Sequence, residues 1–184
     1  APSPVNRRAK RTPFPLVDLY QTAVGKKWVM AVTGIALMGF VFAHMFGNLK
    51  LYQGPVDIDA YAAGLKTLGY PLLPNGFVVW LLRVGLLVVF ALHIHSAYSL
   101  TMMNRRSNSA GGGTRRDTIA ANFAARTMRW TGIIVAAFLV WHLADFTWGW
   151  SFVNPDYQYG AVYENVVASF PRPAVAIAYV VANL

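Results

Sequence analysis

The four histidines of this 184-residue chain all lie in long apolar segments, and none lies in a charged connection. His44 belongs to one such segment, His93 and His95 to a second, and His142 to a third. An ionisable side chain in a membrane-like segment is costly and usually marks function, although a neutral histidine can also serve only as a hydrogen-bond partner between helices. Because the chain contains no cysteine, thiolate nucleophiles, disulfides and iron–sulfur ligation within it are excluded.

An internal repeat pairs two of these histidines. The segment "MAVTGIALMGFVFAH", which ends at His44, aligns at a constant offset of 98 residues with "MRWTGIIVAAFLVWH", which ends at His142. If both helices run in the same direction, the two imidazoles lie at one depth, about 20–24 Å from the inner end. Such a pair can bind one metal ion from opposite sides. Zinc is poorly supported because it usually takes four ligands, whereas a bis-histidine b-type haem uses two and suits electron transfer.

The second apolar segment carries a histidine at a different depth. His95 lies about eight residues before its inner end, or about 12 Å from that face, which predicts a second, inner level. Three glycines each stand ten residues before a histidine, and this spacing favours His95 over His93 because glycine allows a bulky planar group to approach the backbone. The same glycines could serve only helix packing. They are Gly34, Gly85 and Gly132.

The elements that must position these histidines are membrane-spanning helices. The chain is 56% hydrophobic and only 12% charged, and three segments reach the roughly 20 residues that a hydrocarbon core requires. They are Trp28–Leu49, Phe77–Met103 and Thr127–Trp150. We therefore predict an all-α transmembrane helical bundle over residues 28–184, preceded by a basic arm over residues 1–27. A fourth apolar run from Pro173 to Leu184 reaches only about 18 Å, so we expect the native product to continue and complete this span.

The distribution of charge predicts the orientation of the spans. Basic residues dominate the N-terminal arm and the connection Asn104–Arg126, whereas the other two connections mix acids with few bases. The positive-inside rule places the arm and that connection in the cytoplasm, in a multi-pass protein of the inner or plasma membrane. The net charge of +9 could instead indicate a nucleic-acid or anionic-lipid patch. The alternation of sign from loop to loop favours topology, and we expect no nucleic-acid partner.

Two further ionisable residues lie within the predicted spans. Arg83 is about six residues inside the outer end of the second span, where it could pair with a haem propionate or extend to the headgroups. Asp145 follows His142 by three residues and therefore lies on nearly the same helix face. It could belong to a proton path, but we expect it to be solvated near the interface.

The segments "FVFAHMFGN", "HSAYSL" and "FLVWHLADF" resemble the cytochrome b membrane-anchor subunits of succinate:quinone oxidoreductases. The most similar type is the di-haem, five-span anchor of menaquinone-linked succinate dehydrogenases and fumarate reductases. The resemblance implies two b haems, with an outer one held by His44 and His142. The inner one would use His95 and a histidine of the next ligand helix, and the sequence contains no such residue after His142.

The resemblance also implies a function and partners. The chain would be a non-catalytic electron-transfer subunit of the respiratory chain, linked to the tricarboxylic acid cycle, and would pass electrons between an iron–sulfur subunit and menaquinone. A flavoprotein subunit, the iron–sulfur subunit, quinone and membrane lipid are the expected partners. One alternative is a cytochrome b anchor of another respiratory dehydrogenase. Another is a non-haem proton or ion transporter, which predicts no Soret band.

Overall fold

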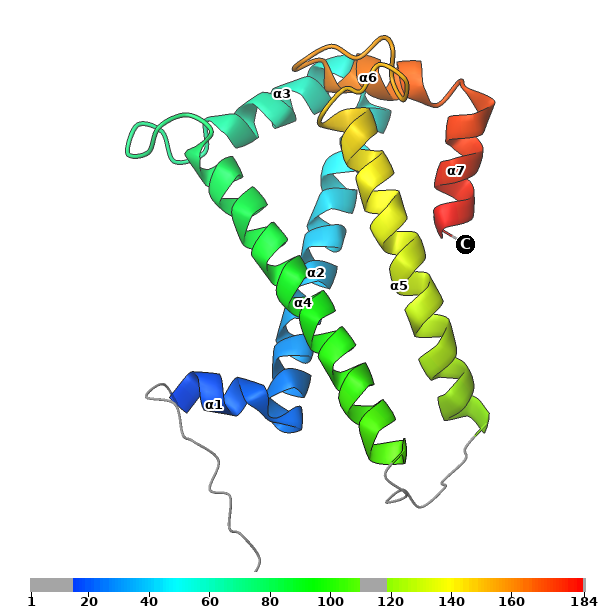
Figure 1. The fold of residues 1–184 in the computed structure, drawn as a ribbon. Helices are drawn as coiled ribbons and strands as arrows, with labels where there is room; N and C mark the ends of the chain where they lie inside the picture. The colour runs from blue at the N-terminus through cyan, green and yellow to red at the C-terminus, as the bar shows by residue number, and fades with distance from the viewer. Residues whose placement is uncertain (1–14, 110–118, 184) are drawn as a thin grey trace, which may run out of the picture. The chain divides into compact units, whose positions relative to one another are not determined.

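The computed structural model describes residues 15–109 and 119–183. Within these two ranges the regular structure is helical, without strands, which confirms the all-α prediction. Three helices contain a stretch long and apolar enough to span a membrane, as predicted (Figure 1). They are α2 (Ala23–Leu49), α4 (Phe77–Ser109) and α5 (Ile119–Phe146).

The predicted third span begins at Thr127, as in the structure, but its predicted end is wrong by several residues. Helix α5 ends at Phe146 rather than at Trp150, although the apolar residues continue. Beyond it, the backbone N–H of Trp148 donates to the carbonyl of Leu143 at 2.8 Å. Gly149 then takes a φ of 59°, a left-handed conformation that glycine adopts without a Cβ penalty. Hydropathy therefore extended the predicted helix past its actual end.

The described residues fall into two compact units. One unit contains helix α1 (Pro15–Gln21), α2 as far as Phe42, and α4 from Leu82 onward. The other contains the remainder of α2, the first turn of α4, and α5 with the short helices that follow it. His93 and His95 belong to the first unit, and His44 and His142 to the second.

In the first unit, a tight corner joins α1 to α2. Thr22 caps α2, because its Oγ1 accepts a hydrogen bond from the backbone N–H of Gly25 at 2.9 Å, the usual role of an N-cap threonine. The ammonium group of Lys26 donates to the carbonyl of Tyr20 at 3.0 Å and lies 4.8 Å from the centre of that ring. The residues that follow α1 thus fix its final turn.

In the second unit, short helices cover one end of α5. Helix α3 (Pro55–Lys66) follows a 3₁₀ turn, Lys50–Gln53, and α6 (Val162–Ser169) packs against both α3 and α5. Asp59 caps α6 from α3, because its Oδ1 accepts hydrogen bonds from two backbone N–H groups at the start of α6, at 2.9 and 3.2 Å. Such caps satisfy donors that have no partner within the helix.

The fourth apolar run is helical. Helix α7 (Pro173–Asn183) packs against α5. Together, α6 and α7 form a pair that is apolar enough for a span but bent by 98°. The apolar run from Pro173 was predicted from the sequence, whereas α6 and the arrangement of α6 and α7 over α5 were not.

Candidate functional site

The structure brings His44 and His142 together. His44 lies near the C-terminal end of α2 and His142 near the C-terminal end of α5, and both belong to the second unit. Their ring centroids are 5.8 Å apart and the ring planes are perpendicular. The two histidines at equivalent positions of the sequence repeat are therefore neighbours in the structure.

This spacing is suited to a metal ion held between two imidazoles. A metal about 2 Å from one nitrogen of each ring separates the ring centroids by about 6 Å, which is close to the observed distance. In residues 15–109 and 119–183, no group of three or more His, Cys, Asp or Glu side chains could hold a metal ion. His44 and His142 offer two imidazoles, the donor set that a bis-histidine haem takes, whereas a zinc site usually takes four ligands.

Aromatic rings surround His142. Phe138, one turn earlier on α5, stacks on its ring with centroids 5.7 Å apart, and Phe146, one turn later, lies 5.5 Å away. Tyr179 of α7 contacts the same ring at 6.2 Å. An apolar aromatic wall of this kind fits the large apolar surface of a haem, which the protein must shield from water.

A buried polar cluster lies next to His142. The carboxylate of Asp145 is fully buried, and Ser169 Oγ lies 2.7 Å from both of its oxygens. The hydroxyl of Tyr179 donates to Oδ2 of Asp145 at 3.1 Å. The guanidinium of Arg172 donates to Ser169 Oγ at 2.9 Å and lies 4.0 Å from Oδ1 of Asp145. Arg172 also donates to the carbonyl of Val153.

The expectation that Asp145 is solvated at the interface is therefore wrong. Its side chain is 0% exposed, because α6 contributes Ser169 and α7 contributes Tyr179 to its surroundings. A buried carboxylate requires hydrogen-bond donors or a cation to offset its lost hydration. Ser169, Tyr179 and Arg172 supply them.

The cluster extends to the histidine. Nδ1 of His142 lies 3.3 Å from the hydroxyl oxygen of Tyr179, which itself donates to Asp145. A continuous hydrogen-bonded chain therefore runs from α5 to α7 and back to α5. Sequence reasoning missed Tyr179 and Ser169. The available signal was Asp145 itself, since a carboxylate in an apolar helix predicts a partner even when the pattern does not reveal which.

In the first unit, the two histidines of α4 have different hydroxyl partners. Nδ1 of His95 lies 2.5 Å from the hydroxyl of Tyr20, whose ring stacks on the imidazole with centroids 5.8 Å apart. Nδ1 of His93 lies 3.0 Å from Oγ1 of Thr33 in α2. The hydroxyl of Tyr20 is also 3.2 Å from Oγ of Ser96, which is fully buried.

Gly34, Gly85 and Gly132 were predicted to allow a bulky group or another helix to approach the backbone closely. Only Gly34 has such a neighbour among the described residues. A Cβ added to Gly34 would lie 3.3 Å from Cε1 of His93, so Gly34 allows close approach of α2 to His93. A Cβ at Gly85 or Gly132 would meet no atom of the described residues within 4 Å. Arg83, the predicted propionate partner, has an exposed side chain on α4.

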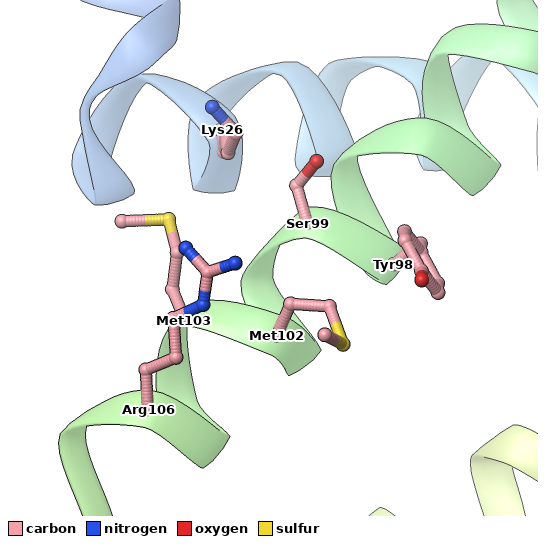
Figure 2. Close-up of a pocket in the computed structure, with 6 residues that line it drawn as sticks. All are labelled: Lys26, Tyr98, Ser99, Met102, Met103 and Arg106. Carbon is pink, nitrogen blue, oxygen red and sulfur yellow. The ribbon is translucent and has the colours of Figure 1, made fainter.

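A shallow pocket of about 340 Å³ lies between α2 and α4 in the first unit (Figure 2). Two basic residues, Lys26 and Arg106, line it together with apolar and hydroxyl side chains. The remaining lining residues are Tyr98, Ser99, Met102 and Met103. Lys and Arg side chains near helix ends commonly extend toward lipid headgroups. The pocket adds no further candidate ligand to His95.

Comparison of the chain with protein-family models, with curated proteins and with solved structures found no match.

Proposed function

We propose that this chain is a haem b-containing membrane subunit of a succinate:quinone oxidoreductase that passes electrons between an iron–sulfur subunit and menaquinone. The observation that carries the proposal is the 5.8 Å approach of His44 and His142, which lie on two helices long and apolar enough to span a membrane. A haem with both axial positions filled supplies one-electron transfer rather than oxygen activation. The sequence resemblance supplies the class of the complex.

The chain's own residues have defined roles in this proposal. His44 and His142 would hold the outer haem, and Phe138 and Phe146 would help to exclude water from it. His95 would hold an inner haem, and Arg83 would pair with a haem propionate. The orientation that we propose has the basic N-terminal arm in the cytoplasm, where it faces the iron–sulfur and flavoprotein subunits.

Purification of the complex from native membranes tests this function. We expect the chain to copurify with a flavoprotein and an iron–sulfur protein, and succinate to reduce a b-type haem in the sample. A complex without haem, or one whose haem is reduced by formate or hydrogen but not by succinate, would contradict the assignment. The second outcome would favour the anchor of another respiratory dehydrogenase.

A non-haem proton transporter is the second candidate. The chain from Asp145 through Tyr179 to His142 is the kind of intramembrane hydrogen-bonded path that such proteins use. This alternative predicts that the purified protein has no Soret band. It also predicts proton flux through liposomes that contain the chain alone.

A further inference from the structure

We propose that Tyr179 is a positioning residue for His142: its hydroxyl links the Asp145 carboxylate to Nδ1 of His142 and so leaves the imidazole lone pair on Nε2, free to bind a metal. This inference rests on the proposed function insofar as the group between the two histidines is a haem. It assigns a role to α7, which the sequence analysis treated only as the start of a fourth span.

The donors and acceptors of Asp145, Tyr179 and His142 determine the direction of each hydrogen bond between them. An ionised carboxylate only accepts, and a tyrosine hydroxyl has one proton to donate. The Tyr179 proton goes to Oδ2 of Asp145, at 3.1 Å. The hydroxyl oxygen of Tyr179 can therefore only accept a hydrogen bond at its other contact, which is Nδ1 of His142 at 3.3 Å. Nδ1 must then carry the proton, and a neutral imidazole protonated at Nδ1 has its lone pair on Nε2.

The carboxylate of Asp145, where these hydrogen bonds begin, is held in place by its neighbours. Ser169 lies 2.7 Å from both oxygens of Asp145, and Arg172 lies 4.0 Å from Oδ1. Asp145 and Ser169 are both 0% exposed. Bulk water therefore does not compete for the carboxylate, and a hydrogen bond in such an environment is stronger than one in water.

Contacts with three phenylalanine rings hold the Tyr179 ring in its position. Its centroid lies 5.5 Å from that of Phe138, 6.0 Å from that of Phe146 and 5.0 Å from that of Phe170. Phenylalanine at position 179 can preserve these ring contacts while removing only the hydroxyl. The Tyr179→Phe substitution therefore separates the hydrogen bond from the packing.

The first test measures the outer haem in the whole complex. An acceptor on Nδ1–H raises the basicity of the ligating nitrogen and so favours ferric over ferrous iron. In Tyr179→Phe we expect the haem to remain, and the ferric-to-ferrous ratio at a fixed potential to fall about tenfold. This is a rise of about 59 mV in midpoint potential for a one-electron couple. Tyr163 lies at the start of α6, where its backbone N–H donates to Asp59. Tyr163→Phe is the matched control and should leave the potential unchanged.

Retained haem with an unchanged potential in Tyr179→Phe would overturn the inference. If Tyr179→Phe loses its haem, Asp145→Asn decides. This variant keeps the side-chain size and weakens the acceptor, and we expect a smaller shift in the same direction. An unchanged midpoint potential in Asp145→Asn would contradict the proposed role of the hydrogen bonds from Asp145 through Tyr179 to His142.

A second test needs no haem. The ¹⁵N shifts of the imidazole nitrogens distinguish the two neutral tautomers of His142 in haem-free protein labelled at histidine, with His142→Ala used to assign the signal. We expect the Nδ1–H form in the unsubstituted chain and a mixture in Tyr179→Phe. The Nε2–H form in the unsubstituted chain would sink the inference. Protein that binds no haem but shows the Nδ1–H form would contradict only the proposed function.

Discussion

His93 and His95 illustrate how two residues of one type, two positions apart, can have different surroundings. Residues at this spacing leave a helix about 200° apart. His93 meets Thr33 of α2, whereas His95 meets Tyr20 of α1. Both have a hydroxyl at Nδ1, so the contacts alone do not select one of them as a ligand. The glycine spacing and the resemblance carried by the segment HSAYSL are the reasons for predicting His95.

Substitution of each histidine by alanine tests that choice. We expect His95→Ala to remove or shift the inner haem, because it deletes the proposed ligand. His93→Ala, the matched control on the same helix, should leave the haem content nearly intact, because only the contact with Thr33 is lost. Redox titration of the two variants resolves the centres. Loss of the inner centre from the His93 variant alone would show that the wrong residue was selected.

At the candidate site, residue type could be predicted but partners could not. The offset of 98 predicted that His44 and His142 share a depth, and the structure places them 5.8 Å apart. Asp145 was expected in water because its position on α5 suggested the interface. Its burial depends on Ser169 and Tyr179, which lie more than twenty residues further along the chain on helices that change direction by 98°. No local sequence pattern predicts that change of direction between α6 and α7.

At the scale of the elements, the corner between α1 and α2 depends on one glycine. A Cβ on Gly25 would lie 1.9 Å from the carbonyl oxygen of Leu19, and a backbone atom cannot move aside cheaply. Gly39, further along the same helix, offers a matched site, since a Cβ there would meet nothing within 4 Å. The two glycines therefore predict opposite responses to the same substitution.

We expect Gly25→Ala to destabilise the first unit by about 1–3 kcal/mol, because the added methyl group forces the backbone of α1 away from α2. Gly39→Ala should be neutral or stabilise the helix by about 0.5–1 kcal/mol, because alanine loses less conformational entropy than glycine. Thermal unfolding in detergent compares them. Equal unfolding temperatures for the two variants would contradict the close contact at Gly25.

The long helices could be predicted from the sequence, but the short ones could not. Runs of about 20 apolar residues have few other structural explanations, and the three predicted spans are helical except at the end of the third. Helices α1, α3 and α6 are 7, 12 and 8 residues long, and sequences of that length have no strong helical preference of their own. Contacts such as Asp59 with the start of α6 stabilise them, and these pair residues about 100 positions apart.

At the scale of the whole molecule, the proposed orientation can be tested with single cysteines, because the sequence contains none. Ser107 near the end of α4 and Leu72 in the connection before it both have exposed side chains. We expect an impermeant maleimide to label Leu72→Cys in intact cells. Ser107→Cys should react only in inverted vesicles. The reverse pattern would invert the topology and place the basic arm outside the cytoplasm.

The central claim is that His44 and His142 hold the same haem. The most direct measurement is haem quantitation, combined with a reduced-minus-oxidised spectrum, of the unsubstituted complex and of the His44→Ala and His142→Ala variants. We predict a b-type haem in the unsubstituted protein and loss of the same spectral component in both variants, because each removes one side of a single axial pair. A protein without a haem band, or variants that lose different haems, would contradict the account.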